Sequence, residues 1–218
     1  IGLSSSELHG RNFDQETSRS AVGQPIGSFF VYEADGLFQS DAEIQNYKND
    51  RGELLQPNAK PGDIRFKDLN GDGVINSDDR DFKGNPLPDC SMGLTLGFNY
   101  KNFDVSAFFQ GVFGNEVYNL TNYLGEFYNQ AQYNKNSTIL DAWRPDNTDT
   151  DIPRVTLDDP NNNIRPSTYY IHNASFVRLK NLKVGYTLPD KVASKLKLKR
   201  TYIYLQGQNL FTITGYEG

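Results

Sequence analysis

The sequence has little of several features that mark common protein classes. It holds a single cysteine, Cys90, so no disulfide can form within the chain. No segment approaches the roughly 20 apolar residues that a membrane-spanning helix needs. Positive charge is not in excess either. The net charge is −5, which argues against a groove that binds nucleic acid through phosphate contacts.

A signal peptide is also missing from the start of the sequence. Residues 1–4 (Ile-Gly-Leu-Ser) contain no charged start followed by an apolar stretch. We therefore expect either a protein that is not exported or an internal piece of a longer one. The sequence stops just past an alternating stretch near residue 213, which favours an internal piece.

Aromatic residues and glycine are abundant. The chain has 14 Phe, 13 Tyr and 19 Gly. Soluble domains usually build their cores from Leu, Ile and Val. A chain that is rich in aromatics and poor in long apolar runs suits an all-β protein, which includes the antiparallel barrels of outer membranes.

Strict alternation of apolar and polar residues predicts two neighbouring strands at 91–100 and 103–113. Between them Lys101 and Asn102 form a tight hairpin turn, in which Asn102 can take a positive φ. Each arm is about ten residues long, the length of a tilted strand that crosses a membrane.

Further strands are expected at about 23–32, 174–188 and 201–213. The alternation changes phase near Lys180 and Asn181, which predicts a β-bulge.

Connections of two very different lengths join these strands. Two long polar segments, 33–90 and 114–172, separate the strands on one side, whereas the link 189–200 is short. Long connections at one end and short turns at the other are typical of an outer-membrane barrel. In such a barrel the long segments would be extracellular. One face of the hairpin would contact lipid (Leu94, Leu96, Phe98, Val105, Ala107, Phe109) and the other would line the lumen (Thr95, Gly97, Ser106, Gln110).

Residues 68–79 have the oxygen spacing of an EF-hand-like calcium loop. Ca²⁺ collects six to eight oxygens, and Gly73 at the sixth position permits the sharp turn around the ion. The expected ligands are Asp68, Asn70, Asp72, the Val74 carbonyl, Asn76 and Asp79. The loop also resembles dockerin-type loops. The resemblance is partial, because the segment 80–88 that follows the loop cannot form a helix. The alternative is an Asx-rich turn that binds no metal.

Aromatic residues are concentrated in the second long segment, where Tyr123, Tyr128 and Trp143 are candidates for stacking on a substrate. The alternative is that these rings pack the segment onto its neighbours, because large aromatics mostly bury area. His9 and His172 lie far apart and no nucleophile has a recognisable context, so we expect no enzyme.

Eleven short stretches occur in a characteristic order: 22–30, 35–39, 61–75, 84–89, 108–111, 114–115, 143–145, 152–154, 174–181, 185–189 and 207–212. Together they resemble the C-terminal part of SusC/RagA-type TonB-dependent outer-membrane transporters of Bacteroidetes. The resemblance spans about residues 20–216.

The resemblance implies a large transmembrane β-barrel in the outer membrane of a Gram-negative bacterium. It also implies a plug and a TonB-contacting segment that this chain lacks, a SusD-like surface lipoprotein as partner, and import of glycans or peptides. The chain would supply barrel wall and extracellular loops. The competing interpretation is a secreted calcium-binding β-sandwich that binds carbohydrate or mediates adhesion.

Overall fold

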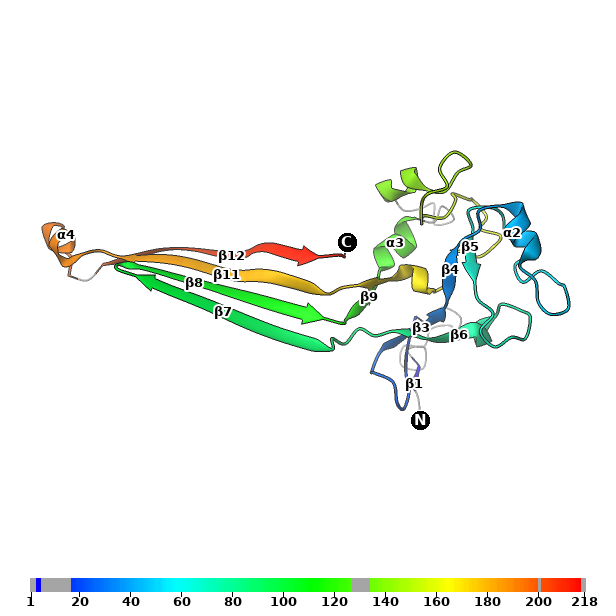
Figure 1. Ribbon diagram of the computed structural model, residues 1–218, viewed down its shortest axis with the longest axis horizontal. Helices are drawn as coiled ribbons and strands as arrows, with labels where there is room; N and C mark the ends of the chain where they lie inside the picture. The colour runs from blue at the N-terminus through cyan, green and yellow to red at the C-terminus, as the bar shows by residue number, and fades with distance from the viewer. Residues whose placement is uncertain (1–2, 5–16, 127–133, 200, 217–218) are drawn as a thin grey trace. The chain divides into compact units, whose positions relative to one another are not determined.

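In the computed structural model, residues 3–4, 17–126, 134–199 and 201–216 are described (Figure 1). The chain separates into two compact units. The loop unit comprises Ile1–Pro86 and Val117–His172, and the strand unit comprises Leu87–Glu116 and Asn173–Glu217. Within the described residues, both four-stranded sheets are antiparallel, as an all-β chain of this pattern predicts.

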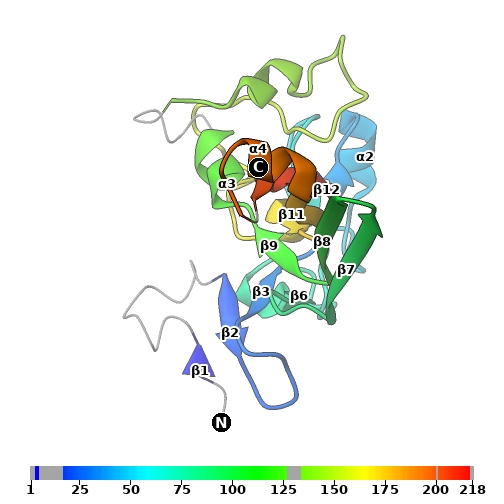
Figure 2. The same ribbon diagram turned by 90° about the vertical axis from the view of Figure 1, so that its left-hand side faces the viewer.

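The strand unit is one sheet of four long strands in the order β12-β11-β8-β7. Figure 1 shows them side by side, with the short helix α4 at one end, and Figure 2 views the sheet from that end. The elements are β7 (Cys90–Tyr100), β8 (Phe103–Phe113), β11 (Phe176–Thr187), α4 (Asp190–Lys195) and β12 (Tyr202–Thr214).

The register between strands gives the sheet one apolar and one polar face. Leu96 pairs with Ala107 and Phe98 pairs with Val105, so the alternation on β7 continues in phase on β8. Val105 in turn pairs with Val184 of β11. The apolar face therefore runs without interruption across the sheet, as the alternation predicts.

The turn between β7 and β8 differs in detail from the expectation. Lys101, with φ 53°, takes the left-handed conformation that we expected of Asn102. Asn102 instead bonds to the end of β11. Its backbone carbonyl accepts a hydrogen bond from Thr187 N at 2.8 Å, and its side-chain Nδ2 donates to the Thr187 carbonyl at 2.7 Å.

The expected β-bulge is present. Both ladders of β11 shift register between Leu179 and Asn181. Against β8, Lys180 is the extra residue, whereas against β12 it faces two residues, Asn209 and Leu210. Lys180 Nζ donates to Gln110 Oε1 at 2.9 Å. Asn209 on β12 has φ 50°, so the neighbouring strand absorbs the irregularity too.

The two long polar segments of the sequence fold mainly as parts of the loop unit. Segments 33–90 and 114–172 contain short strands, short helices and a hydrophobic core. The strand expected at 23–32 is only Ser28–Tyr32, and it belongs to this unit and not to the long sheet. One sheet has the order β1-β2-β3-β6, and β4 pairs with β5.

The other elements that the structure describes are short. The strands are β1 (Leu3–Ser4), β2 (Ser18–Ser20), β3 (Ser28–Tyr32), β4 (Ala34–Leu37), β5 (Ile64–Phe66), β6 (Arg80–Gly84), β9 (Glu116–Tyr118) and β10 (Ile171–Asn173). The helices are α2 (Asp41–Asn46) and α3 (Leu120–Gly125), with 3₁₀ turns η2 (Ser77–Asp79), η3 (Ser137–Asp141) and η4 (Thr168–Tyr170).

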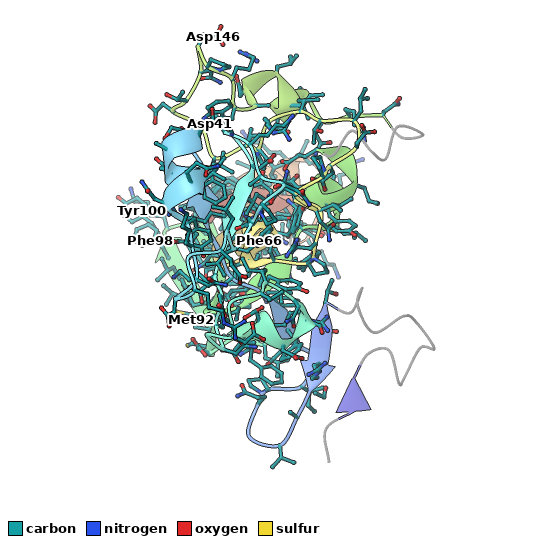
Figure 3. All side chains as sticks on the ribbon, turned by 90° about the vertical axis from the view of Figure 1, so that its right-hand side faces the viewer. Asp41, Phe66, Met92, Phe98, Tyr100 and Asp146 are labelled. Atoms are coloured by element: carbon teal, nitrogen blue, oxygen red, sulfur yellow. The ribbon has the colours of Figure 1, made fainter. Side chains whose placement is uncertain are left out.

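The core of the loop unit gathers residues from distant positions. It consists of Leu37, Ile64, Phe66, Trp143 and Tyr170. Phe66, labelled in Figure 3, is fully buried. Burying a large apolar side chain contributes about 1.5–3 kcal/mol, so this cluster gives the short strands the stability that their length cannot provide.

Candidate functional site

The predicted calcium loop forms a tight turn between β5 and β6. Gly71 and Gly73 have φ values of 73° and 89°, which favour glycine. A Cβ on Gly73 would lie 2.7 Å from Asn49 Nδ2, so no side chain fits there. The glycine at the sixth loop position therefore has the role that the sequence predicts.

Two carboxylates organise the loop from inside. Asp68 accepts hydrogen bonds from Gly71 N at 2.7 Å and Gly73 N at 2.8 Å. Asp79 is fully buried and accepts from Leu69 N at 2.9 Å and Asn76 N at 2.7 Å. Each carboxylate thus satisfies backbone amides that the turn would otherwise leave without partners.

The remaining predicted ligands lie on the more open side of the loop. Asp72 accepts from Val74 N at 2.8 Å, Asn70 accepts from Asp72 N at 2.8 Å, and Asn76 accepts from Asp78 N at 2.7 Å. The Val74 side chain is exposed. These bonds are the Asx turns that the alternative reading of the sequence predicts.

The expected ligands of the loop are all oxygen atoms, the ligand type that Ca²⁺ prefers. Among the residues that the structure describes, no three His, Cys, Asp or Glu side chains gather as a metal site. The expected ligand set contains three carboxylates, Asp68, Asp72 and Asp79, which are therefore not gathered as a metal site in this structure. Calcium binding therefore stays a prediction.

The three candidate stacking residues have different positions. Tyr123 of α3 is half-buried, with its ring 5.3 Å from that of Tyr170. Trp143 is only 8% exposed, and its Nε1 donates to Gln39 Oε1 at 2.8 Å. Tyr128 lies outside the described residues. A stacking platform needs an open ring face, so the burial of Trp143 favours the packing alternative for that residue.

A junction that the sequence did not reveal holds Trp143 in place. Asp63 is fully buried, and its carboxylate accepts a charged hydrogen bond from Arg154 Nε at 2.7 Å. A Cβ on Gly62, whose φ is 88°, would lie 2.6 Å from Trp143 Cε3 and 2.8 Å from Arg154 Cβ. Three stretches that carried the family resemblance, 61–75, 143–145 and 152–154, therefore meet at one point.

Side-chain amides fasten the backbone of β5 at this junction. Gln56 donates to the Ile64 carbonyl at 2.9 Å and accepts from Phe66 N at 2.8 Å. Asn163 accepts from Ile64 N at 2.9 Å and donates to Asp63 Oδ1 at 2.9 Å. No local pattern could predict these contacts, because their partners are up to 100 residues apart.

Glu126 is a further buried carboxyl in the loop unit. It accepts a hydrogen bond from Tyr169 Oη at 2.7 Å. Burial raises the pKa of Glu126, and the bond from Tyr169 lowers it in part. Burial also raises the pKa of Tyr169, so this phenol stays protonated.

The strand unit exposes its apolar face. Leu94, Phe98 and Leu205 are 55%, 64% and 79% exposed. Figure 3 labels Met92, Phe98 and Tyr100, three members of this face on β7. A contiguous apolar patch over four long strands needs an apolar environment, which is either lipid or a partner.

Helices give no candidate for a membrane span. Within the described residues, none is both long and apolar enough to cross a bilayer.

Known proteins match almost all of the chain. No family model matches it. TonB-dependent receptor P3 of Formosa agariphila is 37% identical over 96% of the chain and 20% of the receptor. TonB-dependent receptor SusC of Bacteroides thetaiotaomicron is 29% identical over 90% of the chain and 17% of the receptor.

A solved structure of the RagAB peptide importer in its open-open state matches with a TM-score of 0.67 and 26% identity, over 95% of this chain and 21% of that one. The chain spans about a fifth of the length of the curated relatives that it matches. Over nearly its whole length, the chain is therefore homologous to a segment of the TonB-dependent receptors of the SusC and RagA type.

Proposed function

We propose that this chain forms part of the wall and the outer loops of an outer-membrane TonB-dependent importer of nutrients. The observation that carries the proposal is the four-stranded sheet of the strand unit. Its apolar face is continuous across all four strands and is exposed on the two outer strands, β7 and β12.

The dimensions of the sheet agree with a membrane wall. Its strands have 11 to 13 residues, compared with the roughly 9–11 that a tilted strand needs to cross a bilayer. Its other face carries side chains that suit a water-filled lumen, among them Thr95, Ser106 and Gln110. A β-sandwich would cover the apolar face with a second sheet, but Leu94 and Phe98 are more than half exposed.

The two outer strands of the sheet support a larger barrel. Within the described residues, β7 and β12 each pair on one side only. A sheet in lipid cannot keep open edges, because unpaired backbone groups have no water to bond. Strands outside this chain would therefore continue the sheet on both sides.

The relatives suggest what the complete receptor does. For a receptor of the SusC or RagA type we expect a SusD-like surface lipoprotein as partner. The RagAB structures are of a peptide importer. We infer that the loop unit lies outside the cell, where such a lipoprotein and a glycan or peptide nutrient could contact it. Energy would come through TonB and a plug outside this chain.

Sidedness tests this proposal. Protease added to whole cells should cut an epitope tag placed after Asn58 or Asp146 in the loop unit. It should spare a tag after Lys197, in the short β11–β12 connection. Lys197 is exposed, whereas Ala193 in the same connection is fully buried. Cleavage at Lys197 with both loop-unit tags protected would contradict the proposal.

We also propose that the loop 68–79 binds one Ca²⁺ and so stiffens this outer surface. The ligands would be Asp68, Asn70, Asp72, Asn76 and Asp79 with the Val74 carbonyl. Calorimetric titration of the receptor with calcium should show a site that Asp72→Ala removes. Asp146→Ala, at an exposed position outside the loop, is the control and should keep it. Identical titrations of wild type and Asp72→Ala would mean that the loop is only a turn.

A further inference from the structure

Arg165 of the loop unit carries a positive charge without a close counter-ion. Its guanidinium carbon lies 4.5 Å from the Phe66 ring centroid and 5.1 Å from that of Tyr32. Nε and Nη2 each donate at 3.0 Å, to the carbonyls of Asn162 and Asn161. Among the residues that the structure describes, no carboxylate forms an ion pair with it. The neutral carbonyls leave the charge uncompensated.

The two acids whose charge acts on Arg165 are engaged elsewhere. They are Asp159 and Asp79. Asp159 accepts from Asn163 N at 2.8 Å and Ile164 N at 3.0 Å, and Asp79 holds backbone amides of the loop 68–79. Burial lowers the pKa of Arg165, but a guanidinium keeps its proton at neutral pH.

A pocket opens beside this guanidinium. Its volume is about 430 Å³, which lies within the range of small-molecule sites. Tyr32 and Tyr123 contribute aromatic rings, Ile164 contributes an apolar side chain, and Ser77 contributes a hydroxyl. All of these residues belong to the loop unit. The pocket thus combines one cation with ring surfaces.

We propose that this pocket binds a carboxylate carried on a small, compact skeleton. The carboxylate would pair with the remaining donors of Arg165, and the skeleton would lie against the tyrosine rings. A guanidinium matches the planar geometry of a carboxylate, and aromatic faces suit sugar rings or short aliphatic chains. The source is either an acidic sugar or the C-terminus of a peptide. The site lies within the loop unit and does not depend on the barrel.

Paired probes test the proposal on the purified receptor that contains this chain. D-glucuronate is compared with D-glucose, and glycylglycine with glycylglycinamide, by ligand-observed NMR titration. At least one carboxylate should bind with a dissociation constant below about 10 mM, and its neutral partner at least about tenfold more weakly. The pair that shows the difference identifies the source.

Variants place the binding in this pocket. Arg165→Gln removes the charge, and Ser77→Phe fills the pocket while leaving Arg165 intact. Both should abolish the preference for the carboxylate. Arg144→Gln, which changes an exposed arginine of the same unit, should keep it. If Arg165→Gln does not fold, Ser77→Phe decides.

Three results would overturn the proposal. The first is that neither carboxylate binds to the wild-type receptor. The second is equal binding of the charged and neutral partners. The third is that Ser77→Phe retains the preference, because the carboxylate would then bind elsewhere.

Discussion

Asp63 and Asp146 both pair with an arginine, but in opposite environments. The Asp63 side chain is fully buried beside Arg154, whereas the side chains of Asp146 and Arg144 are 82% and 52% exposed. Removing one partner of a buried pair leaves an unpaired buried charge, and removing one partner of an exposed pair costs little. The two pairs therefore make a matched comparison at the scale of single residues.

We expect Asp63→Ala to destabilise the loop unit by about 3–5 kcal/mol. The loss of the Asp63 carboxylate also leaves Asn163 and the Lys60 amide without their acceptor. Thermal unfolding of the receptor and protease sensitivity of its loops measure the effect. Asp146→Ala should change neither. Equal behaviour of the two variants would show that the junction does not stabilise the unit.

Replacing Glu126, unlike replacing Asp63, should stabilise the protein at neutral pH. Because burial raises its pKa in the folded state above the usual 4.5, Glu126 stabilises the fold below that pH. This contribution is lost as the pH rises through the folded-state pKa. At neutral pH the ionised carboxyl is therefore a cost, and Glu126→Gln should raise the unfolding temperature.

The glutamine keeps an oxygen that can accept from Tyr169, so the hydrogen bond survives the change. The gain should shrink as the pH is lowered, since wild type is then protonated too. The gain is measured by comparing the unfolding temperatures of wild type and Glu126→Gln from neutral pH down to acidic pH. A gain of equal size at every pH would exclude ionisation as the cause.

Single residues were the least predictable level of this structure. The spacing in 68–79 correctly indicated a glycine-dependent loop, because its partners are local. The burial of Trp143 and the contacts of Asp63 depend on segments about 90 residues away, beyond the reach of any local pattern. Arg165 was missed for the same reason.

At the scale of strands, two glycines of the polar face have contrasting surroundings. A Cβ on Gly185 of β11 would lie 2.0 Å from Tyr202 Oη and 2.5 Å from Asp104 Oδ1. Tyr202 lies over this glycine and donates to Asp104 at 2.9 Å. Gly97 of β7 has no atom within 4 Å of the position of its Cβ.

Gly185→Ala should therefore destabilise the strand unit by about 1–3 kcal/mol, because the methyl group displaces the Tyr202 ring. Gly97→Ala should be tolerated. Thermal unfolding of the two variants in detergent is the measurement. If Tyr202→Ala rescues Gly185→Ala, displacement of the ring is the cause, and a failure to rescue would refute it.

Strands were predictable where they are long. The period of two in 91–113 fixed the faces of β7 and β8, and the change of phase at Lys180 indicated the bulge. The strands of the loop unit have at most five residues, too few for a periodic signal. Side chains such as Gln56 and Asn163 support them, so the sequence resembles that of a loop.

At the scale of the whole molecule, the chain combines a long sheet with a second unit, built from Ile1–Pro86 and from the connection Val117–His172 between β8 and β11. The family resemblance is confirmed by relatives that match up to 96% of the chain. The chain spans about a fifth of a receptor and so cannot form a whole barrel. The central claim is therefore that the sheet lies in lipid with its apolar face outward.

Spin labels on alternate positions of β7 and β8 test that claim most directly. In the receptor in lipid, labels at Leu94, Leu96 and Val105 should be accessible to oxygen, which concentrates in the bilayer. Labels at Thr95, Ser106 and Gln110 should be accessible to a water-soluble nickel complex or shielded from both reagents. If labels at Leu94 and Leu96 met the nickel complex while Thr95 met oxygen in lipid, the sheet would not be a membrane wall of the kind proposed.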